Sequence, residues 1–255
     1  MALIAFVGDC HYQFHNMFEF FVAWQNRTGH KIDAIVHVGD FGVDQFNPNW
    51  AYYWREQHPA PIPTYVCLGN HEDYRAVSQW MVEPERIPNL HLLPDGEVTD
   101  VAGLKIACVW GNYSPKSWLH PERLELVRKQ APESFKAMHI YRPSVEKLLA
   151  YPGLVDVLIT HDCSTAIVPR GFGGRPVPKG LMAVMGLDKD ETAPPGCPGF
   201  TQLLDKFQPQ YHFYGHFHVR EDRELGPTKI ICLNAFDQCK YNLSLAIEIV
   251  DFQNE

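Results

Sequence analysis

Five short polar segments, each at the end of a hydrophobic run, carry side chains that could bind divalent metal ions. They are Gly8-Asp9-Cys10-His11, Gly39-Asp40, Gly69-Asn70-His71-Glu72, Thr160-His161-Asp162 and Gly215-His216-Phe217-His218. Carboxylate and amide oxygens and imidazole nitrogens are donors that intermediate divalent cations prefer. The combination predicts metal-dependent hydrolysis, in which two cations about 3.5–4 Å apart would activate a water molecule for in-line attack on phosphorus.

Each segment follows a run of β-like apolar residues. The runs cover residues 3–7, 34–38, 64–68, 155–159 and 211–214. A strand that ends in Gly and a polar ligand places that ligand at the carboxyl edge of its sheet, where open α/β folds bind substrates. We therefore expect the five strand ends to converge on one site. Any single Gly-Asp pair can be only a turn, and the chain has 13 histidines, so the prediction depends on the whole set.

Length and composition are those of a globular protein with a substantial core. The chain has 255 residues, 45% of them hydrophobic, and a formal net charge of −8. This charge argues against a bulk nucleic-acid binding surface, which would need Lys and Arg to displace counterions. The seven cysteines are scattered and odd in number, which favours free thiols in a reducing cytoplasm. We expect neither an export signal nor a membrane span.

The remaining pattern predicts one α/β domain, residues 1–255, with two packed mixed β-sheets flanked by helices in four αββα layers. Helical spacing is found at residues 14–25, 50–56, 74–80, 121–130 and 143–150. Residues 90–93, 97–100 and 104–110 are expected to form antiparallel hairpins. Residues 229–233 and 243–250 are expected to complete the second sheet. Residues 163–199 are rich in Gly and Pro and predict a loop insertion near the site.

The motifs GDCH, GDF, GNHE, THD and GHFH resemble those of the calcineurin-like metallophosphoesterase superfamily over nearly the whole chain. The resemblance implies a phosphoric ester hydrolase with two divalent metal ions, Mn, Fe, Zn or Ni. It assigns Asp9, His11 and His218 to one metal and makes Asp40 the bridge. Asn70, His161 and His216 would hold the other metal.

The resemblance also gives His71 the place of a histidine that is not a ligand and that donates a proton toward the leaving oxygen. Imidazole suits this work because its unperturbed pKa, ~6.5, lies near operating pH. Glu72, and alternatively Asp73, would orient the ring as part of the catalytic set. The competing interpretation is that His71 only caps the turn.

Further segments are similar to the RNA lariat debranching enzymes, a branch of this superfamily. They include His139-Ile140-Tyr141-Arg142, residues 155–162 and Gln208-Pro209-Gln210-Tyr211. One departure is Asp9, because eukaryotic members of that branch typically carry Cys there. A second comparison concerns the phosphoprotein phosphatases, whose GDxxDRG motif contains an Arg that this chain lacks after Asp40. Arg clamps a phosphate in a bidentate manner, so its absence favours a phosphodiester.

Substrate contacts are predicted from basic and aromatic residues outside the motifs. Arg142, together with Arg170, Arg175 and Lys179, could reach a second phosphate, or could be solvated surface charges. Tyr113 and Trp118 could stack on a base or pack under the long loop. Cys10, between two ligands, is expected to face the core.

These observations predict a phosphodiesterase for nucleotide or RNA-type substrates. The alternatives are a phosphomonoesterase or protein phosphatase and, in another class, a non-catalytic metal-binding scaffold.

Overall fold

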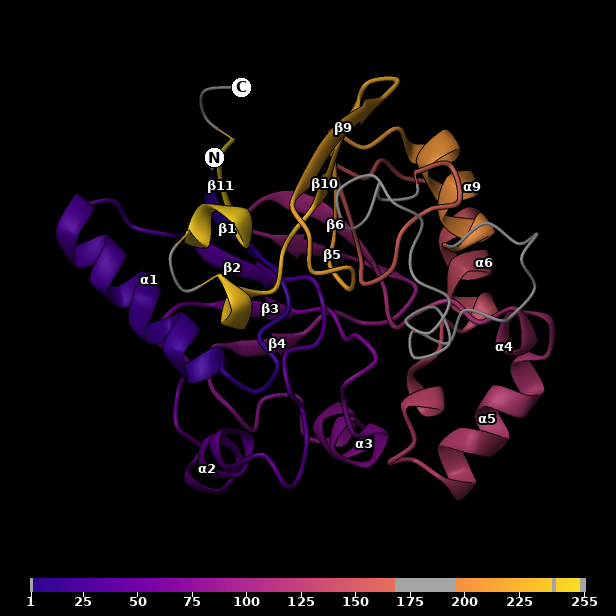
Figure 1. Ribbon diagram of the computed structural model, residues 1–255, viewed down its shortest axis with the longest axis horizontal. Coiled ribbons are helices and arrows are strands. Elements are labelled where there is room, and N and C mark those ends of the chain that lie inside the picture. Colours follow the sequence, from indigo (N-terminus) through magenta and orange to yellow (C-terminus); the bar gives the residue numbers. More distant parts are fainter. Residues whose placement is uncertain (1, 168–195, 240–241, 253–255) are drawn as a thin grey trace.

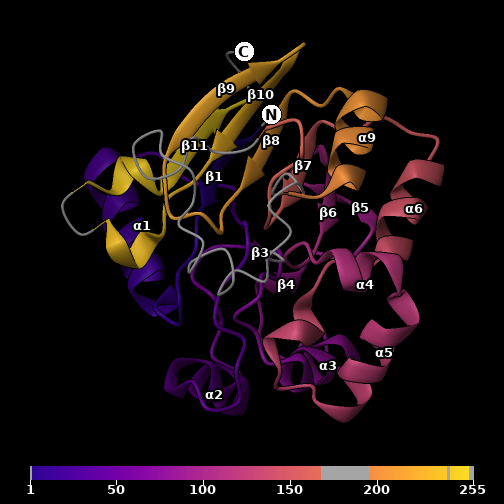
Figure 2. The ribbon, with the colours of Figure 1, turned by 45° about the vertical axis from the view of Figure 1, so that its right-hand side comes forward.

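Two β-sheets pack face to face, and helices cover the outer face of each (Figures 1 and 2). The computed structural model describes residues 2–167, 196–239 and 242–252. Its two mixed sheets and flanking helices confirm the predicted αββα architecture.

The first sheet has five strands in the order β11-β1-β2-β3-β4. Their bounds are β1 Leu3–Val7, β2 Ala34–His37, β3 Thr64–Val66, β4 Leu90–Leu92 and β11 Ile247–Asp251. Strands β1 to β4 are parallel, and β11 pairs antiparallel with β1. On this side of the sandwich lie α1 (Phe14–Thr28), α2 (Pro48–Glu56) and α3 (Tyr74–Val82).

The second sheet has six strands in the order β5-β6-β7-β8-β10-β9. Their bounds are β5 Glu97–Val101, β6 Leu104–Val109, β7 Val157–Thr160, β8 Tyr211–Tyr214, β9 Glu221–Leu225 and β10 Thr228–Cys232. The inner four strands are parallel, and β5 and β9 form antiparallel edges. Its helices are α4 (Pro115–Leu119), α5 (Pro121–Gln130), α6 (Arg142–Ala150) and α9 (Pro198–Phe207). Three short 3-10 turns complete the described elements: η1 (Phe135–Met138), η2 (Phe236–Gln238) and η3 (Leu243–Leu245).

The alternation of side chains along the second sheet divides the interior into two cores. In β6, Ile106 and Cys108 belong to the core between the sheets, whereas Ala107 and Val109 belong to the core under α6 and α9. This is the period of two expected for a strand buried on both faces. The rings of Phe6 and Phe213 stack with centroids 3.9 Å apart and join the two sheets.

The predicted strand over residues 243–250 is wrong in extent and in its sheet. Leu243–Leu245 form the 3-10 turn η3, and β11 begins only at Ile247. This strand pairs with β1, Ala5 opposite Ile249, so it belongs to the first sheet and not the second. Alternating apolar residues indicate a half-buried strand, but they carry no information about which sheet receives it.

Two other expectations are corrected near the middle of the chain. Strand β4 pairs parallel with β3, Tyr65 opposite His91, so only β5 and β6 form an antiparallel hairpin. Helix α9 begins at Pro198, inside the segment that composition assigned to a loop. The ends of that segment meet, since the Cys197 N–H donates to the Cys163 carbonyl at 2.8 Å. Strand β9 and helix α4 were not anticipated.

All seven cysteines are buried free thiols, and Cys10 faces the core as expected. None of the helices described has the length and apolarity required to cross a membrane.

Candidate metal centre

The predicted ligand segments meet where the carboxyl ends of the parallel strands of the two sheets come together. Asp9 and His11 follow β1, Asp40 follows β2 and Asn70 follows β3. From the second sheet, His161 follows β7, and His216 and His218 follow β8. Seven residues predicted from separate motifs are thus brought to one edge of the fold.

The first group of donors is formed by Asp9, His11 and His218, whose ligand atoms all lie within 4.8 Å of one another. Nε2 of His218 lies 3.1 Å from Oδ2 of Asp9. The rings of His11 and His218 meet edge to face with centroids 4.7 Å apart. This contact joins the first and second sheets, and the three donors fit one divalent cation.

The second group surrounds His161, which is fully buried. Its Nε2 lies 3.3 Å from Oδ1 of Asp40 and 3.1 Å from Oδ1 of Asn70. The ring of His216 meets that of His161 with centroids 5.0 Å apart. Ligand atoms of Asp9, Asp40 and His161 lie within 4.8 Å of one another, and with the Asn70 oxygen they form a mixed nitrogen and oxygen donor set that also fits a divalent cation, which His216 adjoins through its ring contact with His161.

The glycines of the motifs are required because the strand ends approach one another closely. A Cβ at Gly69 would lie 2.1 Å from Oδ1 of Asp40, and one at Gly215 would lie 2.1 Å from Oδ1 of Asp9. Side chains at these positions would collide with the ligands, so Gly69 leaves room for Asp40 and Gly215 leaves room for Asp9.

Four predicted ligands also have a left-handed backbone, which is uncommon for residues other than glycine. The φ angles are 40° at His11, 55° at Asp40, 67° at His216 and 51° at His218. Such conformations cost about 1–3 kcal/mol each and cluster at active sites and ligand clamps. Their concentration here supports a functional site.

The electrostatics of the cluster favour a cation. Burial opposes ionisation of Asp9 and Asp40, but His161 and the neighbouring histidines outweigh it and hold the pKa of both carboxyls below the usual value. In return, Asp40 and Asp9 raise the pKa of His161 to about 10 against the effect of burial. The aspartates therefore stay anionic and present negative charge to the site.

Residues outside the motifs orient the imidazoles, and the sequence reasoning missed them. Oδ1 of Asp237 lies 3.0 Å from Nδ1 of His11, and Nε2 of Gln238 lies 2.9 Å from Nδ1 of His218. Nδ1 of His161 lies 3.1 Å from the carbonyl oxygen of Val38. The Asp237 carboxylate and the Val38 carbonyl accept from Nδ1, which fixes the tautomer of His11 and His161 and leaves their Nε2 free for an ion, whereas the Gln238 amide nitrogen donates to His218 and positions its ring.

The ring of His71 lies at the edge of the cluster. Its side chain is 53% exposed, and its Nε2 lies 4.0 Å from Oδ2 of Asp40. Asp40 also fixes the backbone at this point, since its Oδ1 accepts hydrogen bonds from the amides of Asn70 and His71 at 2.7 and 2.9 Å. The ring can therefore reach a group that is bound beside Asp40.

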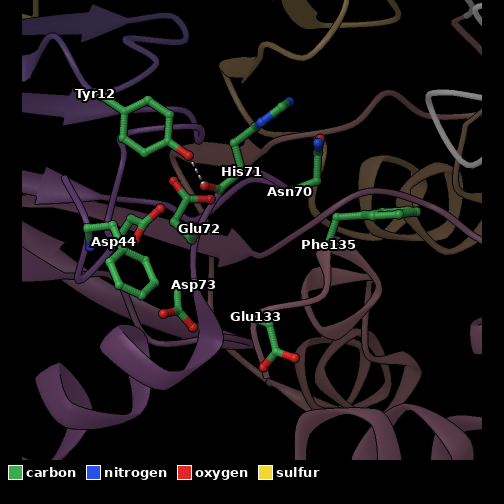
Figure 3. A pocket seen from close by; sticks show the side chains of 9 residues that line it. Tyr12, Asp44, Asn70, His71, Glu72, Asp73, Glu133 and Phe135 are labelled. Atoms are coloured by element: carbon green, nitrogen blue, oxygen red, sulfur yellow. Dashed lines mark hydrogen bonds between the residues drawn. The ribbon is translucent and has the colours of Figure 1, made fainter. Parts of the chain in front are cut away.

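The acids next to His71 do not orient its ring. Glu72 accepts hydrogen bonds from the backbone amides of Phe41, Gly42 and Gly69. Asp73 caps α3 by accepting from the Arg75 amide. The His71 ring extends away from the Glu72 carboxylate (Figure 3). The expected catalytic role of Glu72 is thus replaced by a structural one, which is to hold the loops after β2 and β3 together.

The predicted substrate contacts have other partners in the structure. Arg142 pairs with Glu146 one turn along α6, at 3.2 Å. Tyr113 is half-buried, packs edge to face against Trp118, and its amide donates to Asp162. Trp118 and Tyr113 both pack against the core under α6 and α9, whereas most of the long loop under which they could have packed lies outside the described residues. Arg170, Arg175 and Lys179 lie outside the described residues.

Comparisons with known proteins agree with this geometry. The family model described as calcineurin-like phosphoesterase matches residues 2–220. The chain belongs to this family, and it is a phosphoester hydrolase.

Its curated relatives include lariat debranching enzymes. That of Entamoeba histolytica is 24% identical over 248 residues, which are 90% of this chain and 68% of the relative. That of Danio rerio is 24% identical over 263 residues, covering 92% of this chain and 45% of the relative. The chain thus spans about half the length of several relatives that it matches.

Solved structures share the fold. The phosphopantetheinyl hydrolase of Mycobacterium tuberculosis superposes with a TM-score of 0.51 and 12% identity, covering 100% of this chain and 99% of that chain. Another crystal structure superposes with a TM-score of 0.57 and 12% identity, covering 98% of this chain and 99% of that chain.

Proposed function

We propose that this chain is a phosphodiesterase that uses two divalent metal ions and acts on nucleotide or nucleic-acid substrates. The observation that carries the proposal is the position of Asp40 between two groups of donors. Its Oδ2 lies 3.6 Å from Nε2 of His11, and its Oδ1 lies 3.3 Å from Nε2 of His161. A carboxylate in this position can be shared by two cations.

In this proposal Asp9, His11 and His218 hold one cation, and Asn70, His161 and His216 hold the other. The mixed oxygen and nitrogen donors suit Mn, Fe, Zn or Ni. When bound, two such cations stabilise the charge of the transferred phosphoryl group and lower the pKa of the attacking water. Asp237 accepts from Nδ1 of His11 and so keeps that ring in the orientation and tautomer that this binding needs.

His71 holds the proton for the leaving oxygen. Its ring is solvent-accessible at the edge of the donor cluster and can approach a substrate bound beside Asp40. The assignment as a proton donor follows from this position and from the ability of imidazole to carry a proton near neutral pH.

A diester is favoured over a monoester by the residues that follow Asp40. In the GDxxDRG motif of phosphatases the arginine stands four positions after the first aspartate. This chain has Asp44 at that position, after Gly42 and Val43. The lariat debranching relatives support an RNA-type phosphodiester as the substrate. A phosphomonoesterase is the second candidate.

The loop insertion expected at residues 163–199 lies mostly outside the described residues. We further propose that residues 1–255 form one domain and that the protein works in a reducing cytoplasm. Support for the last point comes from the seven buried thiols.

The test combines metal analysis with two model substrates. We expect about two equivalents of divalent metal per chain, and faster turnover of bis-p-nitrophenyl phosphate than of p-nitrophenyl phosphate. A branched oligoribonucleotide and its linear counterpart would then separate debranching from general diester cleavage. A protein that binds no divalent metal, or that prefers the monoester, would contradict the proposal.

A further inference from the structure

A pocket of about 400 Å³ opens between α3 and α5, and none of the described residues that line it belongs to the donor groups of the metal centre. The two helices lie side by side in both ribbon views (Figures 1 and 2), and the Tyr74 amide at the start of α3 donates to the Pro132 carbonyl beyond α5 at 3.1 Å. The lining consists of Tyr74, Ser78, Glu125, Arg128, Lys129 and Tyr141. A ligand in this pocket would therefore be distinct from an ion held by the donor groups.

Arg128 is held in a fixed orientation in this pocket. Its Nε donates to the Ala137 carbonyl at 2.9 Å. The central carbon of its guanidinium lies 4.7 Å from the centroid of the Tyr74 ring and 5.3 Å from that of the Tyr141 ring. Contacts with aromatic faces stabilise the positive charge and leave the N–H groups in the guanidinium plane able to donate. The Nη atoms form no hydrogen bond with any described residue.

The charge of Arg128 also lacks a carboxylate partner. Each of the other half-buried arginines in the described chain has a carboxylate oxygen within 3.5 Å, the pairs being Arg86–Glu83, Arg142–Glu146, Arg220–Asp222 and Arg223–Glu221. Neither Arg128 nor the exposed Lys129 beside it has such a partner among the residues that the structure describes. A half-buried cation is normally paired, because its partial loss of water is otherwise uncompensated. The pocket therefore offers a preorganised place for an anion.

Glu125 also lines the pocket and restricts which anion fits. Its Oε1 accepts a hydrogen bond from the Tyr141 hydroxyl, which leaves Oε2 able to accept from a ligand. A carboxylate repels an oxyanion unless the oxyanion carries a proton that it can donate. Hydrogen phosphate keeps such a proton near neutral pH, whereas sulfate has none and a phosphomonoester loses its last proton at about pH 6. The lining thus favours inorganic phosphate over other oxyanions.

We propose that the pocket between α3 and α5 binds inorganic phosphate, with Arg128 and Lys129 donating to its oxygens and Glu125 accepting its proton. A guanidinium can donate to two phosphate oxygens at once, which adds geometric specificity to the attraction of charges. The volume lies within the range of about 300–1,000 Å³ that is usual for ligand sites, so the ion can enter with some of its water. Because these residues are not part of the metal centre, phosphate binding here is independent of the proposed hydrolysis.

Equilibrium dialysis of the metal-loaded full chain against radiolabelled phosphate measures how much phosphate each chain binds. Arg128→Met removes the charge but keeps an unbranched side chain that packs well against aromatic rings. This variant should bind one phosphate fewer per chain than the wild type, with an unchanged circular dichroism spectrum. Arg123→Met makes the same change at an exposed position of α5 and is the matched control. Equal phosphate binding by the wild type and Arg128→Met would overturn the proposal.

Glu125→Gln tests the selectivity and leaves the arginine in place. In the wild type at about pH 8, sulfate and methyl phosphate should displace the Arg128-dependent phosphate at least about tenfold less effectively than unlabelled phosphate does. The reason is that a site built around a hydrogen bond of its ligand rejects analogues that lack it. Glu125→Gln replaces a carboxylate oxygen by an amide donor, so sulfate should then compete as well as phosphate. Equal competition by sulfate and phosphate in the wild type would make the pocket a general anion site and would also contradict the proposal.

Discussion

Oδ1 of Asp237 lies 3.0 Å from Nδ1 of His11, although 226 positions separate the two residues. The contact brings η2 against the first ligand motif, and the Phe236 amide adds a hydrogen bond to the Asp9 carbonyl at 2.7 Å. His11 consequently turns Nε2 toward Asp40. A residue far from every motif thus controls how a ligand faces the site.

Replacing Asp237 by Ala is expected to weaken metal binding about 10- to 100-fold while the fold is retained, because partners of metal-binding histidines have effects of this size. Competition with a chromophoric chelator measures the affinity, and circular dichroism checks the fold. Asp205→Ala, at an exposed position on α9, is the control. An affinity equal to that of the wild type would show that His11 needs no orienting partner.

The His71→Ala variant should lose about 10²- to 10⁴-fold in turnover of an alkyl phosphodiester, the usual contribution of a general acid. Its metal content should not change if His71 is not a ligand. Inductively coupled plasma mass spectrometry and steady-state rates provide the two measurements. His30→Ala alters an exposed histidine remote from the site and should match the wild type. Loss of metal together with loss of activity would instead make His71 a ligand.

Removing metal should lower the melting temperature, and restoring it should raise it again. An ion that binds only the folded state stabilises it by about 2.7 kcal/mol at a concentration one hundred times its dissociation constant. Differential scanning calorimetry with chelator and with added Mn²⁺ tests this. Asp40→Asn keeps an acceptor for the amides of Asn70 and His71 but removes the shared charge, so its melting temperature should respond far less to the ion.

Acid should destabilise the protein through His212, which lies outside the donor cluster. Its side chain is fully buried beside the Thr160 hydroxyl, at 2.8 Å, and burial lowers its pKa to about 3. In the unfolded chain His212 binds a proton near pH 6.5, whereas in the folded chain it does so only near pH 3. The contribution of His212 to the free energy of unfolding is therefore fully present above pH 6.5 and is lost as the pH falls toward 3. Between pH 7 and pH 5 this loss amounts to about 2 kcal/mol.

The His212→Gln variant should have a lower free energy of unfolding than the wild type at pH 7. Between pH 7 and pH 5 its free energy of unfolding should fall less than that of the wild type, by about 2 kcal/mol. Urea unfolding in the presence of chelator measures both quantities and keeps metal binding out of the comparison. An identical fall in the two proteins would mean that His212 titrates normally in the folded state.

The ligands were predictable because their signal is local. An apolar run followed by Gly and a donor places Asp9, Asp40 and Asn70 at strand ends, and the fold brings those ends together. The requirement for Gly69 and Gly215 is not local, because it arises from the side chains of Asp40 and Asp9, which follow other strands. The sequence pattern contains these glycines, but only the fold explains them.

Features that depend on contacts between distant parts of the sequence were not predictable. The strand at Ile247–Asp251 carries the alternation of a half-buried strand, yet nothing in that pattern selects β1 as its neighbour. The role of Glu72 was misassigned for the same reason, because two of its three partners lie in the loop after β2. Asp73 was assigned to His71 by adjacency, whereas its Oδ1 caps α3 by accepting from the Arg75 amide.

The pairing of β11 with β1 has a consequence for synthesis on the ribosome. Strand β1, which leads to Asp9 and His11, is synthesised before residues 247–251, so its outer edge stays uncovered until those residues emerge. His218 and Asp237, which complete and orient the first group of donors, also emerge late. Metal loading at this group is therefore completed late in the synthesis of the chain, and an ion captured earlier would meet only two of its three donors.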